Sequence, residues 1–161
     1  MPSEAVQVRP AGLDDLATIY RFILDLADYE QLAHEVDATR EGLAQDLFGP
    51  SPRVFCDMAE IDGAPVGFAL WFYSYSTFRG RHGIWLEDLF VRPEHRGVGA
   101  GLALLRTLAQ RCREEDLARL EWSVLDWNAP AIGFYEALGA KAMDEWTVMR
   151  VDGAALVELA A

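Results

Sequence analysis

The feature that most constrains the fold is a glycine-rich turn between an apolar strand and an apolar helix. Gly97, Gly99 and Gly101 follow the apolar run 84–91 and open a helically spaced leucine series. Three glycines at a helix start are costly unless the backbone must approach something closely. The N–H groups of a helix's first turn attract anions, and Arg96 adds a charge suited to phosphate. The segment therefore predicts a strand–turn–helix unit that holds a diphosphate.

Two common diphosphate motifs do not fit this turn. A Walker loop requires a lysine after its second glycine, and no lysine is present here. A dinucleotide fingerprint requires a third glycine five positions after the first, where Leu102 or Leu104 stands. Asp126 resembles a ribose-binding acid, but it follows Gly97 by 29 positions, rather than the roughly 20 of that motif.

The hydrophobic pattern along the chain predicts one α/β domain over residues 1–161. We expect helices over 13–27, from the cap Thr39 to Phe48, over 99–113, and from the cap Asn128 to Gly139. We expect strands at 6–9, 54–61, 66–75, 84–91, 119–125 and 147–151, with a hairpin turn at Asp62-Gly63 and polar connections at 29–36 and 79–83. The strand–helix alternation of the second half requires a parallel crossover, so the sheet is mixed, with a meander first.

The charge balance favours a cationic partner. Asp and Glu number 26 against 14 Lys and Arg, a net charge of −12. Such a chain is repelled by nucleic acid and anionic lipid, although acidity also simply aids solubility. At 52% hydrophobic and 25% charged residues, the composition excludes a disordered chain.

Targeting, redox and metal signals are weak. No apolar run spans a bilayer, and residues 1–10 contain Glu4 and no apolar core, so we expect no signal peptide and no membrane partner. Cys56 and Cys112 form no CxxC pair, which fits a reducing cytoplasm. The histidines at 34, 82 and 95 share no ligand spacing, so we expect no metal.

A family resemblance rests on the glycine turn. Arg96-Gly97-Val98-Gly99-Ala100-Gly101 matches the R/Q-x-x-G-x-G/A signature of the GNAT acetyltransferases, which bind the pyrophosphate of acetyl-CoA on these amides. The segments 86–91, 127–130 and 134–140 are similar to the diamine (spermidine/spermine) N-acetyltransferase branch, with weaker likeness at Tyr29-Glu30 and Trp146. The resemblance implies a GNAT-like α/β fold, with a mixed, mostly antiparallel central sheet flanked by helices and splayed near the cofactor.

The resemblance also implies the cofactor contacts. Acetyl-CoA would be the acyl donor, with no metal. Its implied contacts are Leu89, Phe90, Val91, Arg96, Gly97, Val98, Gly99, Ala100, Gly101, Leu102, Asn128 and Ala131. Backbone groups of the strand suit the amide-bearing pantetheine arm. Asn128 is first a helix cap and secondly a cofactor contact.

The resemblance places two catalytic side chains. Tyr135 would be the general acid that protonates the departing thiolate; a phenol with a pKa near 10 can do so at a cost of about 2 kcal/mol. Glu87 would attract the substrate ammonium and accept its proton through water. Because side chains alternate along a strand, we expect Glu87 and Asp88 on opposite sides, with one facing the cleft. Without the resemblance, Tyr135 reads as a core aromatic and the Glu-Asp pair as a solvated strand end.

The implied reaction is N-acetylation of a small cationic amine, a diamine or polyamine. The candidate substrate contacts are Tyr29, Glu30, Glu87, Asp88, Asp126, Asp144 and Trp146. Acetylation of a thialysine or lysine-like amino-acid amine is the alternative, and a non-catalytic acyl-CoA sensor is a third. The branch is dimeric, so we expect a homodimer, with 66–75 and 154–161 as candidate contact segments. The sequence does not fix the amine.

Overall fold

The computed structural model describes residues 5–161. Residues 1–4, which carry part of the expectation about a signal peptide, lie outside the described part. The chain divides into two compact units, Met1–Ser123 and Val124–Ala161. Whether 1–161 acts as one domain stays a prediction.

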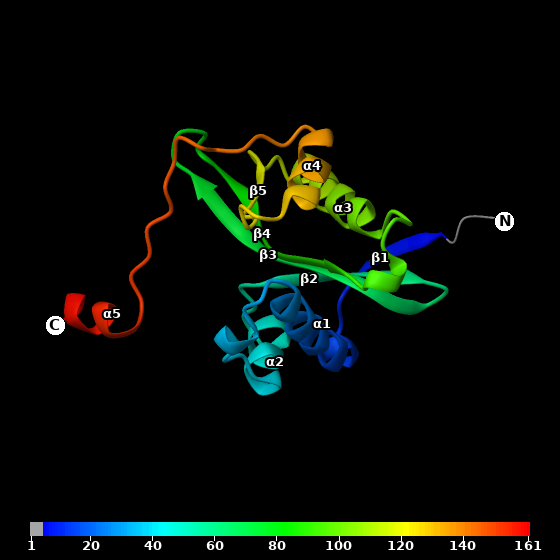
Figure 1. Ribbon diagram of the computed structural model, residues 1–161, viewed down its shortest axis with the longest axis horizontal. Coiled ribbons are helices and arrows are strands. Elements are labelled where there is room, and N and C mark those ends of the chain that lie inside the picture. The colour runs from blue at the N-terminus through cyan, green and yellow to red at the C-terminus, as the bar shows by residue number, and fades with distance from the viewer. Residues whose placement is uncertain (1–4) are drawn as a thin grey trace. The chain divides into compact units, whose positions relative to one another are not determined.

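The first unit is built on a five-stranded sheet, which is mixed, as the sequence pattern predicts, but lacks the sixth strand expected at 147–151 (Figure 1). Its strands are β1 (Val6–Pro10), β2 (Phe55–Ile61), β3 (Ala64–Ser76), β4 (Arg81–Val91) and β5 (Leu120–Trp122), and they lie in sequence order across the sheet. The pairings from β1 to β4 are antiparallel, whereas β4 and β5 are parallel. The helix between β4 and β5 makes the parallel crossover.

Helices cover both faces of this sheet (Figure 1). One face carries α1 (Leu16–Tyr29), preceded by the short turn η1 (Leu13–Asp15), and α2 (Arg40–Phe48); η2 (Ala33–Glu35) connects them. The other face carries α3 (Ala100–Glu114), which follows η3 (Pro93–His95). The core under α1 and α2 consists of Ile19, Phe22, Leu47, Cys56, Met58, Phe68, Leu70 and Phe90. Ile19 and Phe22 of α1 are fully buried in this core, whereas Leu13, where the sequence predicts the helix to begin, lies in η1 and is 62% exposed.

Two local signals in the sequence are confirmed atom by atom. Thr39 caps α2, because its hydroxyl oxygen accepts a hydrogen bond from the Gly42 N–H at 3.0 Å. Asp62 and Gly63 both adopt positive φ, 51° and 78°, as a two-residue hairpin turn between β2 and β3 requires.

Two strand boundaries differ from the expectation. Residues 79–83 are not wholly a connection, because β4 starts at Arg81 and pairs with β3 as far as Ser76. The strand expected at 119–125 forms only over Leu120–Trp122. Its parallel pairing with β4 ends where Leu86 meets Trp122, just before β4 becomes irregular at Glu87.

Strand β3 is interior, which corrects one expected dimer contact. It is paired on one side with β2 and on the other with β4. Val66 and Trp71 are each 2% exposed, so the first half of 66–75 has little surface to offer a partner. Only the far end of the strand emerges, where Tyr75 is exposed.

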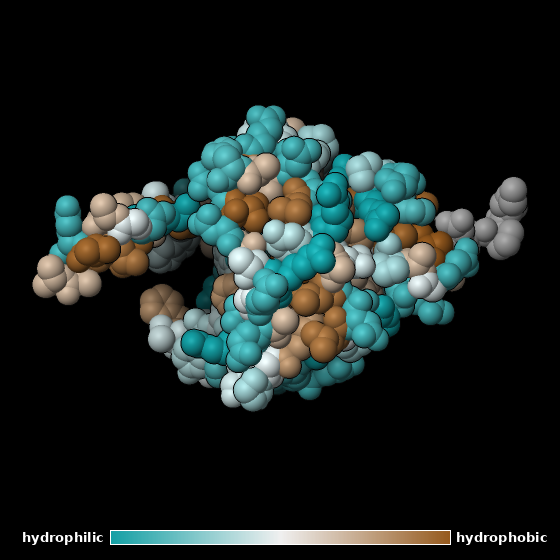
Figure 2. Space-filling view, turned by 90° about the horizontal axis from the view of Figure 1, so that it is seen from below, coloured by the Kyte–Doolittle hydropathy of each residue, from teal (hydrophilic) through white to brown (hydrophobic). Residues whose placement is uncertain are grey.

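The second unit contains α4 (Ala129–Ala137) and α5 (Gly153–Leu159), a helix the sequence reading did not predict. The strand expected at 147–151 does not form. A strand requires a ladder partner for its backbone groups, and this segment has none among the described residues; Val148 and Met149 are 82% and 86% exposed. The side chains of α5 are also largely exposed and apolar (Figure 2, left). Among the described residues, none of the helices combines the length and apolar character needed to cross a bilayer.

Candidate active site

The glycine turn forms an open, amide-lined helix start. Gly97 and Gly99 have φ of 84° and 92°, a region that disfavours any other residue. The first helical hydrogen bond runs from the Ala103 N–H to the Gly99 carbonyl at 2.9 Å, so the preceding N–H groups of α3 have no partner within the helix. A Cβ at Gly97 or Gly99 would meet no protein atom within 4 Å. The backbone therefore faces open space, as the approach of a diphosphate requires.

Arg96 is held beside this turn by two kinds of contact. Its Nε–H donates to the Val91 carbonyl oxygen at 3.0 Å. Its guanidinium carbon lies 5.1 Å from the centre of the Tyr29 ring and 5.9 Å from that of Phe90. The side chain is exposed. A positive charge thus stands directly before the helix start, between β4 and the end of α1.

A β-bulge in β4 changes the expected placement of the two carboxylates. Trp71 pairs with Leu86 and Leu70 pairs with Asp88, so Glu87 is the extra residue on β4. Because of this extra residue, the side chains of β4 after the bulge alternate between the two faces of the sheet in the opposite phase. Asp88, opposite Leu70, therefore faces the α1 side of the sheet, and the Glu87 carboxylate accepts a hydrogen bond from Trp85 Nε1 at 3.0 Å. The expectation that alternation separates the two carboxylates is wrong.

Three carboxylates interact at this place. Glu30 directly follows α1, and the negative charges of Glu87 and Glu30 act on Asp88. Burial, followed by these two charges, raises the pKa of Asp88 to about 7. Burial, followed by the charge of Glu87, also raises the pKa of Glu30 above its ordinary value. Carboxylates that repel one another in a partly buried place are stabilised when a cation binds beside them.

The end of β4 leaves backbone groups for a further strand-like partner. Leu89, Phe90 and Val91 pair with β3 on one side, at Ala69, Phe68 and Gly67. Among the described residues, the pairing of β4 with β5 stops at Leu86. In this stretch, the N–H and C=O groups of every second residue point toward the edge of β4 that β5 does not cover. The two strands therefore separate on the way to the glycine turn.

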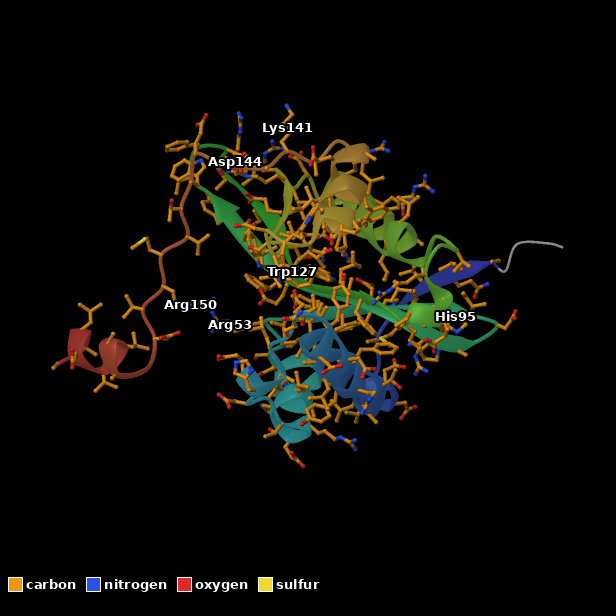
Figure 3. All side chains as sticks on the ribbon, viewed as in Figure 1. Arg53, His95, Trp127, Lys141, Asp144 and Arg150 are labelled. Atoms are coloured by element: carbon orange, nitrogen blue, oxygen red, sulfur yellow. The ribbon has the colours of Figure 1, made fainter. Side chains whose placement is uncertain are left out.

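The remaining predicted residues belong to the second unit. Asn128 caps α4, since its Oδ1 accepts from the Ala131 N–H at 3.4 Å. Tyr135 lies on the same helix, and its ring centre is 5.6 Å from that of Phe134. The side chains of Asp126, Asp144 and Trp146 are exposed (Asp144 is labelled in Figure 3). The first unit thus brings together Tyr29, Glu30, Glu87, Asp88, the end of β4 and the glycine turn. The second unit holds Asp126, Asn128, Ala131, Tyr135, Asp144 and Trp146.

The described residues contain no group of three or more His, Cys, Asp or Glu side chains that could hold a metal ion. His95 lies in the short η3 turn just before Arg96 (Figure 3).

Sequence reasoning missed two residues that shape this region. Trp85 holds the Glu87 carboxylate through its indole N–H. Gly67 lets β3 lie close to the end of β4, because a Cβ there would come within 2.5 Å of the Phe90 carbonyl oxygen. An indole two positions before a strand carboxylate is a signal that could have suggested the first contact; the second depends on a pairing that the sequence does not show.

Comparison with known proteins places the chain in an acyl-transferring class of protein. The solved structure of an integron cassette protein from the mobile metagenome of V. cholerae has a TM-score of 0.79, is 26% identical and covers 96% of this chain and 97% of its own. A family model described as the acetyltransferase (GNAT) family matches residues 16–140, across both units.

The chain belongs to the acetyltransferase (GNAT) family and is an acetyl-transferring enzyme. The thialysine N-epsilon-acetyltransferase of Bos taurus is 40% identical over 166 residues, which cover 96% of this chain and 97% of the bovine protein. The spermidine/spermine N(1)-acetyltransferase-like protein 1 of Homo sapiens is 28% identical over 164 residues, covering 96% of this chain and 24% of the human protein. The resemblance drawn from the sequence is confirmed.

Proposed function

We propose that the enzyme transfers the acetyl group of acetyl-CoA to a primary amine of a small cationic substrate. The observation that carries this proposal is the group of three carboxylates at Glu30, Glu87 and Asp88, where burial, followed by the repelling charges of Glu87 and Glu30, raises the pKa of Asp88 to about 7. A bound ammonium would relieve that repulsion. The first unit also contains Arg96 and the amide-lined start of α3, so the proposed cation site and the proposed anion site lie in one unit.

The residues of the glycine turn fit the diphosphate of acetyl-CoA. Gly97 and Gly99 leave open the space that Cβ atoms would occupy. The amides of residues 97–102 and the Arg96 guanidinium would hold the diphosphate. The edge of β4 at Leu89, Phe90 and Val91 would bind the pantetheine amides as an added strand does. Asn128 and Ala131 stay proposed contacts from the second unit.

The acidic group supports the deprotonation of an amine. Alkyl amines have pKa values near 10, so the substrate arrives protonated. A carboxylate can accept that proton, directly or through water. Glu87, exposed and oriented by Trp85, is our proposed proton acceptor, and Asp88 is the neighbour whose own proton state responds to the cation. We propose Tyr135 as the donor of a proton to the departing thiolate, with Asp126, Asp144 and Trp146 as outer substrate contacts.

The bovine relative favours an amino-acid amine. Its name specifies thialysine, and it is 40% identical over nearly the whole chain, whereas the human spermidine/spermine N(1)-acetyltransferase-like protein 1 is 28% identical. We therefore place a thialysine or lysine-like side-chain amine first. A diamine or polyamine is the second candidate, favoured by the acidic group, which can pair with more than one ammonium.

We propose a homodimer in the cytoplasm. The described cysteines, Cys56 and Cys112, are unpaired, as in a reducing compartment. The apolar side chains of α5 at Leu156, Val157 and Leu159 are exposed and suit a contact with a second copy.

A thiol-release assay with acetyl-CoA tests the proposal. The panel contains thialysine, lysine, a diamine, spermidine and an uncharged amine analogue. We expect the highest kcat/KM for thialysine and negligible activity with the uncharged compound. The Glu87→Gln variant should lower kcat/KM for every cationic amine. A higher kcat/KM for spermidine would select the second candidate, and no thiol release with any of the amines would refute the proposed function.

A further inference from the structure

The last residue of α1, Tyr29, contacts the arginine that precedes the glycine turn. The Arg96 guanidinium carbon lies 5.1 Å from the centre of the Tyr29 ring, within the range of a cation–π contact. The sequence likeness places Tyr29 among the amine contacts. In the structure, its ring instead meets a residue of the acyl-donor side.

Backbone hydrogen bonds hold the last turn of α1, which carries Tyr29. The Leu32 N–H donates to the Ala27 carbonyl at 2.8 Å, and the Gln31 N–H donates to the Asp28 carbonyl at 3.0 Å. This pair of bonds is a Schellman motif, with Gln31 in the left-handed conformation at φ 62°. These backbone hydrogen bonds close the last turn of α1 and so set the direction of the Cα–Cβ bond of Tyr29.

We propose that Tyr29 is a positioning residue for Arg96, and so for the acyl donor, rather than a contact of the amine. The inference rests on the proposed binding of acetyl-CoA at the glycine turn. Arg96 Nε–H is already used by the Val91 carbonyl oxygen at 3.0 Å. Because the Tyr29 ring contacts the guanidinium without taking up an N–H, the four N–H groups of the terminal nitrogens are left for a phosphate.

The contacts of Arg96 strengthen anion binding because they place the guanidinium before the anion binds. An exposed arginine has many rotamers, and restricting them on binding weakens the affinity. The carbonyl of Val91 and the ring of Tyr29 hold the guanidinium before the ligand arrives. The adjacent Glu30 belongs to the acidic group on the amine side, so two neighbouring residues at the end of one helix serve different ligands.

Calorimetric titration with coenzyme A tests the inference. Tyr29→Leu should raise the Kd for coenzyme A about two- to fivefold, the effect of a cation–π contact at a partly exposed site. Tyr29→Phe keeps the ring and should bind coenzyme A as the parent does. The KM for the amine, measured at saturating acetyl-CoA, should not change in either variant. Tyr75→Leu, at the opposite end of the β3–β4 hairpin, is the matched control and should leave the Kd unchanged.

A double-mutant cycle separates this inference from the proposed function. Arg96→Gln alone should raise the Kd for coenzyme A at least about tenfold, as loss of a charged hydrogen-bond partner does. If Arg96→Gln changes nothing, the proposed cofactor site itself is wrong.

If Arg96→Gln weakens binding but Tyr29→Leu weakens binding equally with and without Arg96, Tyr29 has only a structural role and the inference is overturned. An altered amine KM with an unchanged Kd for coenzyme A in Tyr29→Leu would also overturn it. If Tyr29→Leu does not fold, Tyr29→Met, which has a flexible side chain and no aromatic ring, takes its place in the cycle with the same expected and contradicting outcomes.

Discussion

Replacement of Asp88 by asparagine should stabilise the enzyme, and increasingly so as the pH rises. Burial and the charges of Glu87 and Glu30 raise the pKa of Asp88 to about 7, from an ordinary value of 3.8. In the folded enzyme, this carboxyl therefore keeps its proton at pH values where the unfolded chain has lost it. Its contribution to stability is fully present below its unfolded pKa and is lost as the pH rises through about 7.

The size of the effect follows from the shift. A pKa that rises from 3.8 to about 7 corresponds to about 4 kcal/mol of destabilisation above neutral pH. The difference between Asp88→Asn and the parent should grow by about 2 kcal/mol between pH values of roughly 5.5 and 8.5. Asparagine is nearly isosteric and carries no charge at either pH, so the change isolates the ionisation.

Urea unfolding at several pH values measures this difference. The free energy of unfolding of the parent should fall relative to that of Asp88→Asn as the pH rises, with equal m-values. Asp46→Asn, on the exposed surface of α2, provides the control and should show no such divergence. A constant difference between Asp88→Asn and the parent across this range would refute the electrostatic account of the acidic group.

Binding of the amine should release the same proton. An ammonium beside Asp88 favours its charged form, so at a pH near 7 roughly half a proton should leave the enzyme for each amine bound. Calorimetry in two buffers of different ionisation enthalpy counts that proton. Asp88→Asn should release almost none. Equal proton release by both proteins would show that the cation binds elsewhere.

Four further predictions concern chemistry, the glycine turn, charge and assembly. Tyr135→Phe should lower kcat about 10²- to 10⁴-fold with the fold intact; a near-parental kcat in single-turnover measurements would leave Tyr135 a packing role. Gly99→Val, at φ 92°, should raise the Kd for coenzyme A, whereas Gly133→Ala, inside α4, should leave it unchanged; equal affinities in calorimetry would contradict the proposed diphosphate site. Rising salt should lower kcat/KM for a cationic amine, and Glu87→Gln should flatten that dependence; identical salt slopes would exclude Glu87 from capture. Sedimentation at micromolar concentration should give a dimer, and a monomer would remove the proposed assembly.

The parts of this fold that the sequence predicts are those specified by local chemistry. Thr39 and Asn128 cap helices with their own side chains, and Asp62-Gly63 makes a turn that needs no distant partner. The sequence predicts a strand at 147–151, but a strand also requires a pairing partner that a local pattern cannot supply, and none forms. The bulge at Glu87 was likewise invisible, because it exists only in the register between β3 and β4.

The same distinction separates the two halves of the proposed site. The acyl-donor half is nearly continuous in sequence, from the end of β4 through Arg96 to the first turn of α3, and it acts largely through backbone groups. The spacing of its glycines is therefore enough to predict this half from the sequence. The amine half joins Glu30, at the end of α1, to a pair of carboxylates that a bulge turns toward it more than fifty residues later. No local pattern specifies that meeting. In the proposed site, shifting the bulge would therefore alter the amine half while leaving the glycine turn intact.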